Sequence, residues 1–138
     1  PFPIMHLTDE MLLKSKENKH LYIHLFNPEN PNSLSEISAL RRLFEKYKSH
    51  IDFVTIYVSQ SEVNSDFALR LLASIKWEVY SLDYAHPLWK SLNIGSFPYY
   101  ILVNEKQKII GLPALGPNPN GVYKTIEKTF YDIQQGKY

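Results

Sequence analysis

The stretch NPENPNS, residues 27–33, places polar side chains between an apolar run and a segment of helical periodicity, where many proteins carry reactive groups. Ser33 could act as a nucleophile if a base such as His24 activated its hydroxyl, with Glu29 as a further acid. Ser33 and Glu36 also have the S-x-x-E spacing of a capping box, in which the serine caps the helix. The capping box accounts for Ser33 without any chemistry, and we prefer this interpretation.

Two histidines, His20 and His24, would share one face of a strand and form a nominal metal pair. Because a zinc site needs further ligands and no third carboxylate or thiol stands nearby, we expect neither a metal nor another cofactor. His24 is then predicted to be a histidine of the core or of its rim. The sequence also lacks a glycine-rich phosphate loop, an HExxH motif and a Gly-x-Ser-x-Gly motif.

The composition is that of a soluble globular protein, with 138 residues, 44% of them hydrophobic, and a formal net charge of +1. Nucleic acid is not an expected partner, because no block of basic residues is present. There is no cysteine, which excludes disulfides, thiol catalysis and cysteine metal sites. No apolar stretch approaches the roughly 20 residues that span a bilayer. The first residue is Pro1, so we expect any signal peptide or anchor to lie upstream of it.

Alternating strand and helix patterns predict a single α/β domain with a mixed sheet. The apolar runs 21–26 and 51–59 are predicted to be buried strands, and 97–104 with 109–112 a hairpin. Helices are predicted over 33–48, over 64–76 after a cap at Asn64 or Ser65, over 86–93, and from Val122 to near Gly136. Before the core, 4–9 is a predicted strand and 9–18 a predicted helix, so 1–20 would form an extension to the domain 21–138.

This order of elements resembles the thioredoxin fold, a three-layer α/β fold whose mixed sheet is flanked by helices. The segments that carry the resemblance are LYIHLF, IDFVTIYVS, WEVYSL, PLWKSLNIGSFPYYILVNEKQKII and PALGPNPNG. Within that fold, the sequence is most similar to the extracytoplasmic thiol–disulfide oxidoreductases of TlpA type in envelope proteins of Bacteroidetes-type bacteria. The resemblance implies a location in the periplasm or cell envelope, and it implies a cis peptide bond before Pro98.

In redox-active relatives the loop after the first core strand carries a Cys-x-x-Cys motif, and the resemblance aligns it with Asn30, Pro31, Asn32 and Ser33. Asn30 replaces the attacking cysteine and Ser33 the resolving one. Disulfide exchange needs a thiolate, which neither side chain supplies. In thioredoxins proper the strand position of His24 carries a buried carboxylate that serves the resolving thiol. The activity of the relatives is therefore not expected here.

We expect a redox-inactive domain of a longer envelope protein that binds a protein or an extended peptide. Phe97, Pro98, Glu29 and Tyr84 would form the binding surface, beside the loop 113–121. Tyr99 and Tyr100 should point to opposite faces of the sheet, since side chains alternate along a strand. Two alternatives stay open. One is an enzyme with non-redox chemistry through Ser33, His24 and Glu29, and the other is a structural spacer packed on a neighbouring domain of its own chain.

Overall fold

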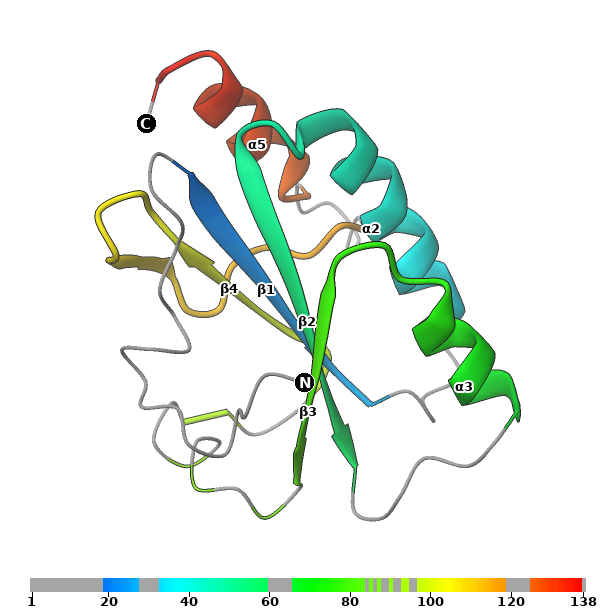
Figure 1. The fold of residues 1–138 in the computed structure, drawn as a ribbon. Helices are drawn as coiled ribbons and strands as arrows, with labels where there is room; N and C mark the ends of the chain where they lie inside the picture. The colour runs from blue at the N-terminus through cyan, green and yellow to red at the C-terminus, as the bar shows by residue number, and fades with distance from the viewer. Residues whose placement is uncertain are drawn as a thin grey trace.

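The fold is described from a computed structural model, over residues 19–27, 33–59, 66–83, 97–118 and 125–137, together with residues 85, 87, 90, 93 and 94. The strands are β1 (His20–Phe26), β2 (Ile51–Ser59), β3 (Glu78–Asp83), β4 (Tyr99–Val103) and β5 (Ile109–Gly111). The helices are α2 (Ser33–Tyr47), α3 (Asp66–Ala73) and α5 (Glu127–Gln134). Strands and helices alternate up to β3, and a β-hairpin and a last helix follow (Figure 1).

The five strands form one sheet in the order β3-β2-β1-β4-β5. β1 lies at its centre, parallel to β2 and antiparallel to β4 (Figure 1). β3 continues the parallel half and β5 the antiparallel half. The predicted mixed sheet is therefore confirmed. Because parallel strands need a long crossover connection, α2 and α3 carry the chain between β1, β2 and β3.

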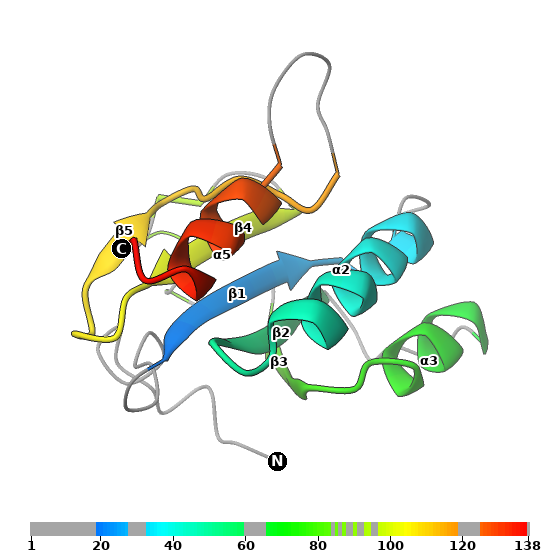
Figure 2. The same cartoon turned by 90° about the horizontal axis from the view of Figure 1, so that it is seen from above.

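The sheet is apolar on both faces, as the continuous hydrophobic run of β1 requires. Leu21, Ile23 and Leu25 point to one face and join a buried cluster there. Tyr22 and Phe26 point to the other face, where they pack with side chains of α2, α3 and α5. α2 lies between the other two helices (Figure 2). We call this the helical face of the sheet.

The carboxylate of Glu127 connects α5 to α2. Glu127 accepts hydrogen bonds from Arg42 at 3.0 Å, from Lys46 at 2.8 Å and from the Tyr47 hydroxyl at 3.2 Å. These donors stand at i, i+4 and i+5 and therefore meet the start of α5 from one side of α2. The start of the last helix is thus held against the C-terminal half of α2.

The long elements follow the sequence closely, while the ends of the short ones differ from their predicted positions. The predictions 33–48 and 51–59 are confirmed as α2 and β2. The prediction 64–76 was too long, because α3 ends at Ala73 and the next hydroxyl, that of Ser74, donates to the Leu71 carbonyl at 2.6 Å. The last helix begins at Glu127 and not at Val122.

Other predicted features lie wholly or largely outside the described residues: the strand 4–9, the helices 9–18 and 86–93, and the cap at Asn64 or Ser65. The division into 1–20 and 21–138 stays a prediction. In the hairpin, Asn104 Oδ1 accepts from the backbone N–H groups of Lys106 and Lys108 at 2.9 and 3.0 Å, which closes the turn without an Asn-Gly pair. No helix in the described ranges has the length and apolar character to cross a membrane.

Candidate functional site

His24 lies at the centre of the sheet, on its helical face, with 1% of its surface exposed. Its place follows from the alternation along β1, which turns Tyr22, His24 and Phe26 towards the helices. The imidazole stacks on the Phe26 ring, with 4.6 Å between the ring centroids. A polar ring at this depth needs partners for both nitrogens, since an unpaired buried group destabilises the fold.

Glu36 supplies the first partner from the first turn of α2. Its Oε1 lies 2.8 Å from His24 Nε2, and the carboxylate is itself buried. The helix dictates this position, because Glu36 shares the inward stripe with Leu40, Leu43 and Tyr47 at helical spacing. The face of α2 that packs on the sheet therefore also places the Glu36 carboxylate in the core.

Tyr100 supplies a second donor to the same oxygen. Its hydroxyl lies 2.8 Å from Glu36 Oε1. Tyr100 is the direct cross-strand partner of His24 in the antiparallel ladder between β1 and β4, and the two rings stack with 5.3 Å between centroids. Tyr22 stacks on the other side of Tyr100 at 5.5 Å and 9°. The Glu36 carboxylate is thus held by two donors on neighbouring strands.

Thr55 and Trp77 complete the network at the other ring nitrogen. Thr55, which pairs with His24 in the parallel ladder, places Oγ1 3.2 Å from His24 Nδ1. Trp77 Nε1 donates to the same Oγ1 at 2.8 Å. An indole N–H can only donate, so Thr55 accepts from Trp77. A carboxylate can only accept, so Nε2 of His24 carries the proton that is donated to Glu36. Nδ1 of the neutral ring is then an acceptor, and the Thr55 hydroxyl donates to it.

This assignment makes His24 a neutral imidazole between a hydroxyl and a carboxylate. Burial lowers the pKa of His24, and the hydrogen bond and charge of Glu36 only partly offset that effect. Burial also raises the pKa of Tyr100, and the negative charge of Glu36 raises it further. Each hydrogen bond of the network therefore points, from donor to acceptor, towards the Glu36 carboxylate, whose negative charge is surrounded by neutral donors.

The predicted binding residues are described only in part. Pro98 is exposed, Phe97 is half-buried against the cluster on the face opposite the helices, and the bond between them is cis, the isomer that the resemblance implies. Glu29, Asn30, Pro31, Asn32 and Tyr84 lie outside the described residues. The helix α2 begins at Ser33, but that side chain is outside the description, so the cap stays a prediction.

The two histidines of the nominal metal pair are both buried but have different partners. His24 is buried as predicted and bonds to Glu36, and His20 Nδ1 faces Glu105 Oε2 at 3.3 Å near the end of the sheet. Within the described ranges no group of three histidine, aspartate or glutamate residues could hold a metal ion. The aromatic prediction is confirmed, because Tyr99 packs on one face of the sheet and Tyr100 on the other.

Comparison with solved structures decides the fold. An uncharacterised thioredoxin-like protein from Bacteroides vulgatus superposes with a TM-score of 0.65 at 20% identity, over 86% of this chain and 74% of that one. This chain has a thioredoxin-like fold. The thioredoxin domain of a thiol–disulfide oxidoreductase from the same species gives 0.64 at 18% identity, over 83% and 81% of the two chains. StoA from Bacillus subtilis gives 0.57 at 19%, over 84% and 83%.

These matches are of the kind that the sequence resembles, although the sequence likeness is too low to show more than the fold. No protein-family model matches the chain, and no curated protein is significantly similar to it in sequence. The network can be compared with the positions that the resemblance assigns in a thioredoxin-like core. At the strand position that the resemblance assigns to a buried carboxylate, this chain has His24, and the carboxylate comes from α2 instead.

Proposed function

We propose that this thioredoxin-like domain is a redox-inactive module that binds a protein or an extended peptide. The observation that carries the proposal is the absence of cysteine from a chain with the fold of thiol–disulfide oxidoreductases. Disulfide exchange proceeds by attack of a thiolate on a disulfide sulfur, and this chain has no thiol. His24, Glu36 and Tyr100 form a closed hydrogen-bond network that stabilises the core and has no thiol to serve.

The alternative of a serine-based enzyme finds no support in the geometry of His24. A general base needs a free nitrogen within hydrogen-bond reach of the nucleophile. Glu36 occupies Nε2 and Thr55 occupies Nδ1, and the ring is shielded from solvent. His24 therefore acts as a structural histidine and leaves Ser33 without this base.

The binding surface that we propose lies around Pro98, where β4 begins. The loop after β5 runs beside this strand, because the Ala114 N–H donates to the Tyr100 carbonyl at 2.7 Å. Leu112 and Leu115 on this loop expose 42% and 45% of their surface. The loop therefore offers exposed apolar side chains beside β4, and an extended peptide is the partner that we propose for them.

The test is selection of peptides from a displayed library on the intact chain. Peptides that bind the proposed surface should lose most of their affinity for Phe97→Asp and Leu115→Asp, since a charge would then stand in an apolar contact. Tyr131→Asp is the matched control, because Tyr131 is 47% exposed on α5 and is not part of the proposed surface. Peptides that bind all four proteins equally, or a selection that enriches none, would refute the proposal. An insulin-reduction assay should show no activity above buffer.

By the same resemblance, we propose an extracytoplasmic location as a domain of a longer envelope protein. A neighbouring domain of that protein is then a natural candidate for the bound partner. Expression of the complete gene product with an epitope tag, followed by cell fractionation, would test the location. Recovery of the protein in the cytoplasmic fraction would exclude it.

A further inference from the structure

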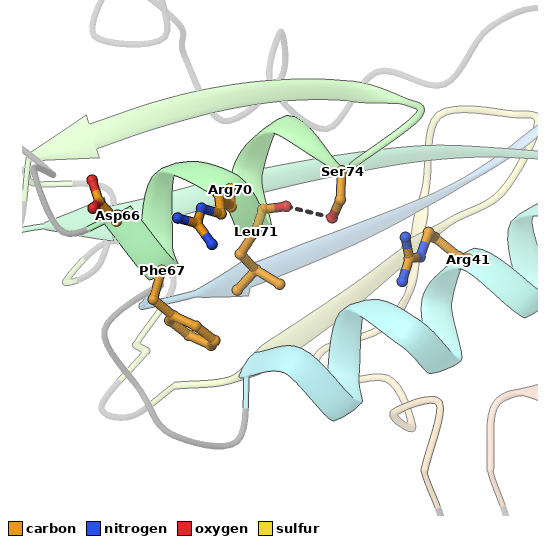
Figure 3. Close-up of a pocket in the computed structure, with 6 residues that line it drawn as sticks. All are labelled: Arg41, Asp66, Phe67, Arg70, Leu71 and Ser74. Atoms are coloured by element: carbon orange, nitrogen blue, oxygen red, sulfur yellow. Dashed lines mark hydrogen bonds between the residues drawn. The ribbon is translucent and has the colours of Figure 1, made fainter.

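A pocket between α2 and α3 lies on the helical face, on the other side of the sheet from Phe97 (Figure 3). Its volume is about 290 Å³, and it is lined by Arg41, Asp66, Phe67, Arg70, Leu71 and Ser74. A volume at or below the lower end for small-molecule sites suits one or two side chains of a partner better than a cofactor. Nothing in the proposed function above uses these residues.

The pocket has an apolar floor and wall. Leu71 belongs to the buried cluster beneath α3, and Phe67 leaves 48% of its surface exposed. Both side chains point from α3 towards the gap between the helices (Figure 3). A half-exposed phenylalanine beside a buried leucine offers a partner a contact that gains from the exclusion of water.

The charge of the pocket is unequal at its two ends. Arg41 reaches from α2 towards the end of α3 where Ser74 lies, and Asp66 stands at the opposite end (Figure 3). Two guanidinium groups against one carboxylate give the lining a formal charge of +1. Neither Arg41 nor Arg70 has an ion pair among the described residues. The neighbouring Arg42, in contrast, is bound to Glu127 at 3.0 Å.

The Ser74 hydroxyl, at the Arg41 end of the pocket, is polar but is not a donor for a ligand. It donates its proton to the Leu71 carbonyl at 2.6 Å and has no proton left for a ligand. Donors for an incoming anion are therefore the two arginines, whose planar groups match a carboxylate. We propose that this pocket binds a protein segment in which an acidic side chain stands next to an apolar one, with the carboxylate at the Arg41 end and the apolar group on Phe67 and Leu71.

The probe is the peptide acetyl-LDFELD-amide, titrated into the ¹⁵N-labelled intact chain and followed by the backbone amide signals. The isosteric neutral peptide acetyl-LNFQLN-amide is the control for charge. We expect the acidic peptide to shift the amides of α3 and of the middle of α2 around Arg41, and the neutral peptide to bind more weakly. No shift at these amides up to about 5 mM acidic peptide would overturn the proposal, since even weak sites bind in that range.

Variants assign the effect to the pocket. Arg41→Gln and Arg70→Gln should each weaken the acidic peptide roughly two- to fivefold, as expected for partly exposed charge pairs. Arg42→Gln, the same change one residue along α2, should leave its affinity unchanged. Asp66→Asn should strengthen binding, because it removes a like charge. Equal weakening by Arg42→Gln, or equal affinities of the two peptides, would refute the assignment.

A second copy of this chain is the other conceivable occupant. Shifts of the same amides with protein concentration alone, abolished by Arg41→Gln, would identify that occupant and overturn the proposal of a separate acidic partner. Phe97→Asp tests the independence of the two surfaces. It should leave the affinity for the acidic peptide unchanged even if the proposed peptide surface at Pro98 proves wrong.

Discussion

His24 Nε2 on β1 and Glu36 Oε1 on α2 lie 2.8 Å apart in the core, and this contact ties the first turn of α2 to the middle of the sheet. His24 occupies the strand position to which the resemblance assigns a buried carboxylate in thioredoxins proper. Because the Tyr100 hydroxyl donates to the same oxygen, loss of either donor leaves the carboxylate partly satisfied. Loss of the carboxylate, in contrast, leaves two buried donors without an acceptor.

Glu36→Ala should therefore lower the free energy of unfolding by about 2–4 kcal/mol, the scale expected when buried groups lose their partner. Glu36→Gln should be milder, because its amide oxygen can accept from His24 and Tyr100 in the same place. Urea unfolding at neutral pH measures both. A Glu36→Ala variant within about 0.5 kcal/mol of the parent would mean that the network adds nothing to stability.

Tyr100→Phe removes one donor and keeps the ring between Tyr22 and His24. We expect a loss of about 0.5–1.5 kcal/mol, the net value of a hydrogen bond with its acceptor still partly satisfied. Tyr99→Phe is the matched control, since Tyr99 is half-buried on the opposite face of the sheet, away from the network. Its unfolding free energy should equal that of the parent. Equal losses in the two variants would contradict the hydrogen bond to Glu36.

The depressed pKa of His24 predicts a loss of stability in acid. Between the pKa of the folded state and the ordinary value near 6.5, the unfolded chain binds the proton and the folded chain does not. Stability should therefore fall as the pH is lowered from about 7 through this window, by up to about 1.4 kcal/mol per pH unit for this one group. Urea unfolding in a series of buffers measures the slope.

His24→Gln should flatten that slope, even though the variant is less stable than the parent at neutral pH. His20 also has a pKa lowered by burial, partly offset by the charge of Glu105, so it adds a term of the same sign. His20→Gln should leave in place the part of the slope that His24 contributes. His50, which is exposed, serves as the control for a substituted histidine. A parent slope unchanged by His24→Gln would show that His24 is not the group that responds.

Gly116→Ala should disturb the same site from the loop. A Cβ at this position would lie 3.0 Å from Tyr100 Cε2, closer than carbon atoms normally approach. The ring cannot move easily, because Tyr22 stacks on one side and its hydroxyl is held by Glu36. Overpacking of this kind lowers stability by about 1–3 kcal/mol. Thermal unfolding would detect it, and a variant that melts like the parent would show that the loop yields.

The fold could be predicted from the sequence because its long elements have strong periodicity. The inward-facing apolar residues of α2 and the apolar run of β2 predicted the bounds of these two elements to within one residue. The short helices were less accurate, since local contacts set their ends: the Ser74 hydroxyl bonds back to Leu71, and Thr125 accepts the Glu127 N–H at 3.2 Å. Such contacts leave no periodic signal.

The buried network could not be predicted, although each residue was visible. Glu36 was interpreted as the partner of Ser33 in a capping box, and its place on the Leu40 and Tyr47 stripe was the overlooked signal. Which strand lies beside β1 decides that Tyr100 and Thr55 meet His24, and pairing over long sequence distances cannot be read from local pattern. Burial of His24 itself was predicted.

Two cysteines placed at residues 30 and 33 would test the alignment of this loop with the Cys-x-x-Cys motif. In the double variant Asn30→Cys, Ser33→Cys, the two thiols would stand three residues apart at the start of α2, which begins at Ser33. Free backbone amides and the helix macrodipole favour a thiolate there. We expect an intramolecular disulfide under mild oxidant, seen by mass spectrometry after alkylation as the loss of two hydrogens and protection of both thiols.

Ser35→Cys, Ser38→Cys is the control with the same spacing inside α2, on exposed positions. Its thiols are held by helical backbone on both sides and should pair far less readily. Cβ atoms of helical neighbours are about 5–6 Å apart, whereas a disulfide needs its two Cβ atoms at about 3.5–4.5 Å. A folded Asn30→Cys, Ser33→Cys variant whose thiols stay free would show that residues 30 and 33 do not occupy the positions of the Cys-x-x-Cys pair. A disulfide in the Asn30→Cys, Ser33→Cys variant but not in the control would mean that this chain keeps the backbone geometry of the Cys-x-x-Cys motif and lacks only the two thiols.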